Sequence, residues 1–237
     1  MENPVLLPNQ SAFYFSVTAI DFDKSYKVRK QRIKHGFSDR DLAFLLGFEP
    51  RYVKDIEDPT HSKRYKPKDT NYLLHIFDCD LPDIMGSSFP RRLYDLCVIV
   101  TATPRKPRTF DIYIKQSSGK WKSYLKLTEL AENEYLPPRS KAEPIDVQEY
   151  LLSLLVDGYL DTSKTGLELY RKCTAHFDSH IKPVFIASAI REINKQRDAP
   201  IHIDKNGMGR WVYGRTTMMK SHSNRIANKN FRNGKPK

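Results

Sequence analysis

The sequence predicts an α+β protein in which helical and strand-forming regions follow one another along the chain. Three observations support this class. After an N-terminal segment, 1–19, apolar residues recur at helical spacing over 20–88, alternate with polar residues over 89–131, and return to helical spacing before a hairpin pattern within 145–219. A chain of 237 residues is long enough for two or three cores.

The first helical region contains two short helices joined by a tight turn. Ser38 is placed to cap the first helix of the pair by accepting a hydrogen bond from a backbone N–H. Gly47 supplies the left-handed turn, and Ala43 is small enough for the second helix to cross closely over the first. Apolar residues at helical spacing are expected to share one core: Leu42, Leu46, Val53 and Ile56.

This stretch resembles the helix-turn-helix of the phage-repressor (Cro/Xre-like) family over about residues 20–85. The resemblance implies that the second helix of the pair enters the major groove of DNA. It also implies an ion pair between Arg32 and Glu57, which correspond to a family arginine and glutamate that hold the recognition helix in place. The alternative is a small helical bundle without this role.

The charge of the helix pair leaves its DNA-reading role open. The family's base-reading positions correspond here to Glu49, Pro50, Arg51 and Asp55, of which only Arg51 suits the task. Residues 39–58 carry three bases and six acids, and acids are repelled by phosphates. An interaction scaffold that docks a protein through this acidic face is therefore the second hypothesis.

The predicted DNA contacts are mainly basic residues on the helix pair and in the loop that follows it, where they can neutralise phosphates. They are Arg40, Arg51, Tyr52, Lys54, Lys63, Arg64, Lys66 and Lys68. A run of bases between Lys24 and Lys34 adds a further candidate phosphate clamp. The alternative is that these long side chains only keep the surface solvated.

The middle region predicts a small antiparallel sheet. Strands are expected over 94–101, 110–115 and 121–128, with a turn at Ser117-Ser118-Gly119. Because side chains alternate between the two faces of a strand, one set is expected to face inward: Phe110, Ile112, Ile114, Trp121, Leu125 and Leu127. The opposite face then carries Tyr113, Lys115, Lys122, Tyr124 and Lys126. Such a face suits stacked bases or an acidic partner, but it is also typical of the solvated side of a small sheet.

Residues 132–144, rich in proline and charge, are expected to link this sheet to a last domain. That domain predicts helices over 146–156, 165–177 and 183–194, then a hairpin through Asn206-Gly207. The order resembles a winged helix in architecture, with outward bases as DNA contacts: Arg191, Lys195 and Arg210. Winged helices also serve as dimerisation and docking modules, so the resemblance does not decide between these roles.

The net charge of +12 is unevenly distributed. Residues 1–88 are neutral, 89–143 carry +5 and 144–219 carry +1. The last segment, 220–237, has six bases, no acid and one large apolar residue, so it cannot bury enough surface to fold alone. We expect a disordered basic tail, which raises affinity for nucleic acid or only aids solubility.

Other classes of function lack support in the sequence. It shows no phosphate-binding loop, nucleophile elbow or HExxH motif, so we expect no enzyme and no cofactor. Cys173 continues an apolar stripe and is expected to be buried rather than to bind zinc with His176 and His180. No apolar run is long enough for a membrane span. The prediction is a cytoplasmic regulator or accessory factor that binds duplex DNA, with a dimer as one option for its oligomeric state.

Overall fold

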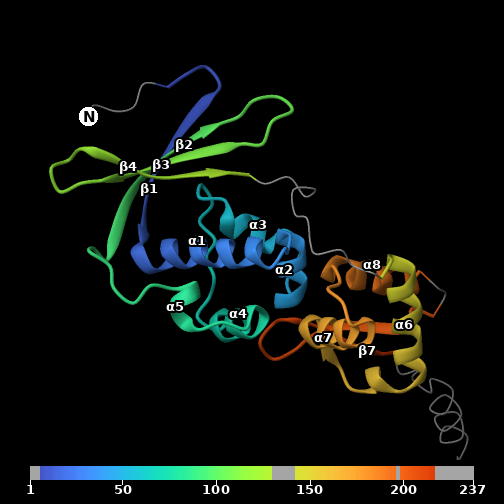
Figure 1. The fold of residues 1–237 in the computed structure, drawn as a ribbon. Helices are drawn as coiled ribbons and strands as arrows, with labels where there is room; N and C mark the ends of the chain where they lie inside the picture. Colours follow the sequence, from blue (N-terminus) through green and yellow to red (C-terminus); the bar gives the residue numbers. More distant parts are fainter. Residues whose placement is uncertain (1–5, 130–141, 196–197, 217–237) are drawn as a thin grey trace, which may run out of the picture.

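The computed structural model describes residues 6–129, 142–195 and 198–216. Within these ranges the protein is a mixed α+β fold with two groups of helices and two antiparallel sheets (Figure 1). Most of the predicted linker and the whole of the predicted basic tail lie outside the described residues.

The larger sheet has four antiparallel strands in the order β1-β2-β3-β4. Their bounds are β1 Gln10–Thr18, β2 Leu93–Thr101, β3 Thr109–Lys115 and β4 Trp121–Thr128. β2, β3 and β4 agree with the predicted strands. β1 was not predicted, and it pairs along its whole length with β2, from Gln10 opposite Thr101 to Thr18 opposite Leu93.

A bulge between β3 and β4 corrects the predicted faces of the sheet. The register shifts between Ile112 and Tyr113, so the residues of β4 before Leu125 change sides. The predicted inward position of Trp121 is wrong, since its ring lies 5.7 Å from that of Tyr14 on the outer face. Tyr124 in turn lies toward the helices, with its ring centre 5.8 Å from that of Phe22.

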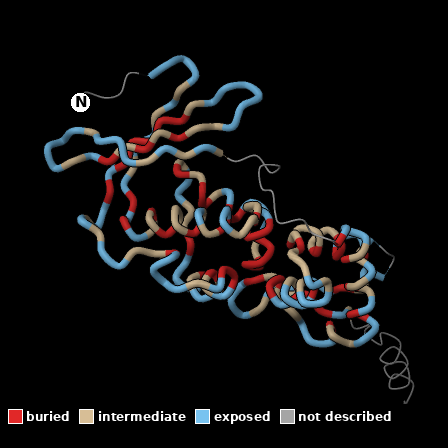
Figure 2. The backbone as a smooth tube through the Cα atoms, viewed as in Figure 1, coloured by how far each residue is buried: buried red, intermediate tan, exposed pale blue. Residues whose placement is uncertain are grey.

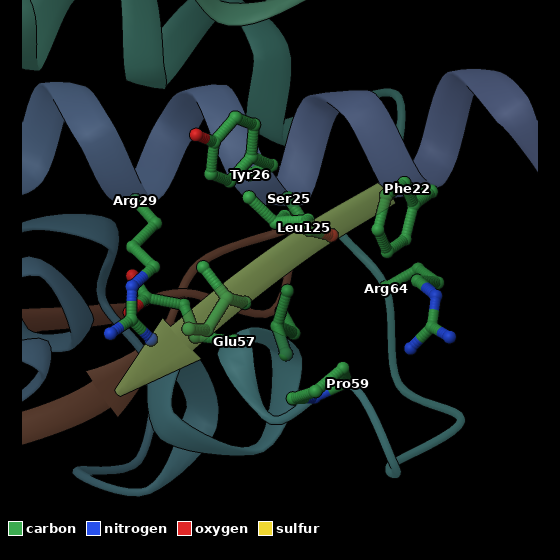
Figure 3. Close-up of a pocket in the computed structure, with 10 residues that line it drawn as sticks. Phe22, Ser25, Tyr26, Arg29, Glu57, Pro59, Arg64 and Leu125 are labelled. Carbon is green, nitrogen blue, oxygen red and sulfur yellow. The ribbon is translucent and has the colours of Figure 1, made fainter. Parts of the chain in front are cut away.

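The first helical group lies on the inner side of this sheet (Figure 1). It contains α1 Ala19–Lys34, α2 Asp39–Leu46, α3 Tyr52–Glu57, α4 Asp69–Phe77 and α5 Leu81–Ile84. Figure 3 shows Phe22 and Ser25 of α1 beside Leu125 of β4 around a cavity of about 30 Å³. The cavity is small, so the sheet packs closely on the helices along this stretch.

Three predicted features around α2 and α3 are confirmed: the Ser38 cap, the turn at Gly47 and the Arg32–Glu57 ion pair. The Ser38 hydroxyl accepts from the Asp41 amide at 3.1 Å while the Asp41 carboxylate accepts from the Ser38 amide at 2.9 Å, which caps α2. Gly47 ends α2 at a φ of 73°. The buried Arg32 donates to Glu57 through Nε at 2.6 Å and through Nη2 at 2.5 Å. The ion pair therefore joins α1 to α3.

The C-terminal elements follow the predicted order. They are α6 Pro144–Val156, the 3₁₀ turn η2 Tyr159–Asp161, β5 Lys164–Thr165, α7 Gly166–Phe177, α8 Pro183–Ile193, β6 Ile201–Lys205 and β7 Trp211–Arg215. The short β5 was not predicted, and it completes a second sheet in the order β5-β7-β6. The turn between β6 and β7 depends on Gly209, at a φ of 74°, as well as on the Asn206 side chain, which accepts from the Met208 amide at 3.0 Å.

Buried residues of the two helical groups form one continuous core, while the sheet has a second core with α1. Figure 2 shows the buried stretches of both groups meeting beside α2. The Phe44 and Tyr213 rings lie 5.7 Å apart. At Gly166, an added Cβ would come within 2.5 Å of the Phe44 carbonyl oxygen. The second group therefore packs directly on α2.

Candidate nucleic-acid interface

Two adjoining clefts border the α2–α3 pair. The sheet-side cleft, about 440 Å³, lies between the pair and the ends of β3 and β4. The hairpin-side cleft, about 1370 Å³, lies between the pair and α8 with the β6–β7 hairpin. Arg40 and Pro50 line both, so the two clefts meet where α2 begins and the turn leads into α3.

Arg51 and Lys54 are exposed on the rim of the sheet-side cleft. The Arg51 side chain is 83% exposed, and its Nε lies 3.9 Å from Asp55 Oδ1. Lys54 Nζ lies 3.1 Å from Glu129 Oε1 at the end of the sheet. Arg51 is thus directed to solvent, whereas Lys54 is already paired with a carboxylate.

Glu129 is the centre of a surface ion network in this cleft. It accepts from Arg108 Nε at 2.9 Å, and Arg108 also donates to Asp58 at 3.1 Å. The hydrogen bond from Arg108, with Lys54 nearby, lowers the pKa of Glu129 from 4.5 to about 2. The sequence alone does not mark Arg108 as a site residue, because its place beside α3 depends on how β3 packs against the helices.

The hairpin-side cleft has a basic rim and an apolar floor. Its bases are Arg40, Lys182, Arg191 and Lys195, so the predicted contacts Arg191 on α8 and Lys195 just after it do lie in one cleft with a predicted contact on α2. Its apolar lining includes Phe44, Phe48, Val184, Ile203 and Trp211. The buried Asp41 is occupied, since it accepts from the Val184 amide at 2.8 Å and so holds the start of α8 against α2.

Tyr52 is not available to DNA in this structure, and its prediction as a contact is wrong. The residue is 7% exposed because it lies on the inward face of α3. Its hydroxyl donates to Asp69 Oδ2 at 2.8 Å, and burial raises the pKa of this phenol. Tyr52 therefore contributes to the core.

The prediction that Arg210 is exposed at the hairpin is also wrong. Arg210 has no exposed surface and donates to the Leu46 carbonyl at 2.6 Å and to Asp69 Oδ1 at 2.9 Å. Its guanidinium carbon lies 3.9 Å from the ring centre of Tyr72. The side chain points inward because the hairpin docks on the turn at Gly47, whose carbonyl accepts from the Trp211 amide at 2.8 Å.

The four predicted contacts in the loop after α3 are not among the described residues that line either cleft. Lys63 Nζ lies 3.1 Å from Asp55 Oδ2, and Arg64 donates to the Lys63 carbonyl at 2.7 Å. Lys68 donates to the Met208 carbonyl, and Lys66 is exposed. This loop mainly supports α3 and the hairpin.

Comparison with protein-family models, with curated proteins and with solved structures finds no match to this chain. Within the described ranges, no His, Cys, Asp and Glu side chains gather in a group of three or more suited to a metal ion. Cys173 is buried as predicted, and burial raises the pKa of its thiol to about 12. No helix in the described part of the chain has the length and apolar character needed to cross a membrane.

Proposed function

We propose that this protein binds duplex DNA and acts as a transcriptional regulator or accessory factor, with α2 and α3 as a helix-turn-helix of the Cro/Xre type. The observation that carries the proposal is the exposed Arg51 at the start of α3, on a pair fixed by Gly47 and by the Arg32–Glu57 ion pair. In this motif the first residues of the second helix contact base edges. Arg51 is then the residue that meets a guanine.

A second contact through α8 extends the proposal. The order of α6, β5, α7, α8 and the hairpin resembles that of a winged helix, in which the third helix would face DNA. Ser188 and Arg191 of α8, with Lys195 just after the helix, line the hairpin-side cleft together with Arg40. A duplex seated on α3 would bring phosphates to these bases, whereas Glu49 at the rim would repel them.

The test uses the full chain, because β1 pairs with β2 and Asp69 pairs with Arg210 across the sequence. Duplexes selected from a random library would be labelled, and their affinity measured by fluorescence anisotropy over a series of salt concentrations. Arg51→Ala should weaken binding by about 1–3 kcal/mol and relax the preference at one base position.

Lys172→Ala is the matched control. It removes one exposed charge from α7, which contributes no described residue to either cleft. Its affinity should stay close to that of the unaltered protein. Equal losses for the two variants, or no salt-sensitive binding of duplex DNA, would contradict the proposal.

The apolar floor of the hairpin-side cleft favours a second candidate function, the docking of a protein segment. Phe48, Ile203 and Trp211 line this floor, which suits the apolar side chains of a partner segment. If this is the function, the protein should form a complex with a partner protein and show no duplex binding at low salt. Ile203→Asp, at a position 42% exposed, should then abolish that complex without loss of fold.

A further inference from the structure

The outer face of the four-stranded sheet, meaning the face turned away from α1, carries a group of aromatic rings. Tyr14 on β1 stands opposite Cys97, and Cys97 stands opposite Tyr113 on β3. The Trp121 ring of β4 reaches to within 5.7 Å of the Tyr14 ring at an angle of 57°. These rings cover Cys97, which is fully buried although it lies on the outer face.

These rings remain accessible. Tyr14 is 51% exposed, and Tyr113 and Trp121 are half-buried. The described helices of the first group lie on the other side of the sheet (Figure 1). Aromatic side chains grouped on one accessible surface are a common feature of binding sites.

The sheet region as a whole is basic. Residues 89–128 carry nine Lys or Arg and only two Asp, in contrast to the acidic excess over 39–58. Both Asp are occupied, since Asp95 accepts from Ser16 Oγ at 2.5 Å and Asp111 pairs with Lys126 Nζ at 3.2 Å. Lys115 Nζ lies 6.0 Å from the Trp121 ring centre. On the outer face itself, Lys115 and Lys126 stand near the rings together with the two Asp, and six of the nine bases lie in the connections at the strand ends.

We propose that the outer face of this sheet binds single-stranded nucleic acid. Unpaired bases would stack on Tyr14 and Trp121, while Lys115 and Lys126 would lie close to the phosphates. Duplex DNA does not fit this chemistry, because its bases are already stacked and only their edges are open. The inference goes beyond the proposed duplex site and does not depend on it, since the two surfaces share no residue.

The test uses tryptophan fluorescence in the full chain. The protein has two tryptophans, so the Trp211→Phe variant leaves Trp121 as the only one. Titration with an unlabelled oligothymidine should quench this fluorescence to a saturating level. In anisotropy measurements, Tyr14→Ala should weaken binding of the same oligonucleotide about 5- to 100-fold, and Tyr14→Phe should retain it.

Matched variants separate this site from the duplex site and from the rest of the chain. Arg51→Ala should leave single-strand binding unchanged, and Tyr14→Ala should leave duplex binding unchanged. Every variant keeps residues 217–237. A difference in single-strand binding between variants therefore comes from the substituted residue and not from this segment. Lys115→Glu, at an exposed position, gives a second reading if Tyr14→Ala does not fold, and it should weaken single-strand binding by a similar factor.

Two results would overturn the inference. One is an absence of quenching at low salt together with unchanged single-strand affinity in Lys115→Glu. The other is equal quenching by poly-glutamate, which would identify the face as a docking surface for an acidic protein. Quenching by the oligonucleotide alone, lost in Lys115→Glu, supports the inference.

Discussion

The α2–α3 pair is held on two sides by arginine–carboxylate contacts that differ in environment. On the hairpin side, the Arg210 and Asp69 side chains are 1% and 0% exposed. On the sheet side, the Arg108 and Glu129 side chains are 36% and 29% exposed, and Lys54 joins them. Water and salt screen the second contact but not the first. The buried contact therefore fixes geometry, whereas the surface contact can yield to an anionic ligand.

The buried contact depends on several acceptors at once. Arg210 donates to Leu46 and Lys68 carbonyls as well as to Asp69, while Asp69 also accepts from the Tyr52 hydroxyl and from the Lys66 amide. Within this contact, Arg210 Nε is buried without a hydrogen-bond partner. A charge pair out of water is tolerated when most of its hydrogen-bonding groups are satisfied in this way.

The largest expected effect comes from removing Arg210. Arg210→Ala leaves the Asp69 carboxylate buried and unpaired, so we expect a loss of about 3–5 kcal/mol in the free energy of unfolding. Urea denaturation of the full chain measures it, and the loss should change little with salt. Arg215→Ala, whose partner Asp161 lies at the surface, should cost under about 1 kcal/mol. Similar losses of unfolding free energy for both variants would show that the buried and the surface ion pairs do not differ in this way.

A smaller loss is expected when the docking surface of the hairpin is altered at Gly47. Its φ is 73°, and an added Cβ would lie 2.9 Å from Arg210 Cβ and 3.1 Å from the Trp211 amide nitrogen. Gly47→Ala should therefore destabilise the protein by about 1–3 kcal/mol. Gly207→Ala, with nothing within 4 Å of the added Cβ, is the control and should be close to neutral. An equally mild Gly47→Ala would mean that the hairpin does not need this close approach.

A change in the surface contact should affect duplex binding more than it affects the stability of the protein. Glu129→Gln removes the carboxylate that pairs with Lys54 and Arg108, so both bases become available to phosphates. We expect duplex affinity to rise a few-fold and stability at pH 7 to fall by less than about 1 kcal/mol. Anisotropy and urea denaturation give the two values. A loss of duplex affinity would show that Glu129 positions these bases for binding instead of competing with the ligand.

The smallest effect is a dependence of stability on pH. The pKa of Glu129 is lowered from 4.5 to about 2, so its stabilising contribution is present above pH 4.5 and is lost as the pH falls toward 2. The difference in free energy of unfolding between the unaltered protein and Glu129→Gln should therefore shrink over this range. A difference that stays constant would mean that the carboxylate is not held in its charged form by Arg108.

The features predicted from sequence are mostly local. Ser38 and Gly47 act within a few residues of their own positions, and the Arg32–Glu57 pair spans 25 residues. Arg210 was predicted wrongly because its partner Asp69 is 141 residues away and belongs to the other helical group. The exchange of Trp121 and Tyr124 follows from one bulge, which alternation cannot reveal.

β1 has a different reason for being missed. Its consecutive Phe13, Tyr14 and Phe15 place aromatic rings on both faces of the strand, so the alternation that marked β3 is absent. Among the residues of the candidate site, Arg51 could be predicted from the sequence pattern of the helix pair alone. Its grouping with Arg191 and Lys195 required the packing of α8 on α2, and the outer-face rings required the pairing of β1.

The pairing of β1 with β2 also affects how the chain assembles. All of α1–α5 lies between these partners, so Gln10 must wait for Thr101 to leave the ribosome. Loop closure over such a separation is slow unless the intervening helices condense first. Until then β1 is a nascent strand with unsatisfied backbone groups and exposed rings, which favours pairing with other chains.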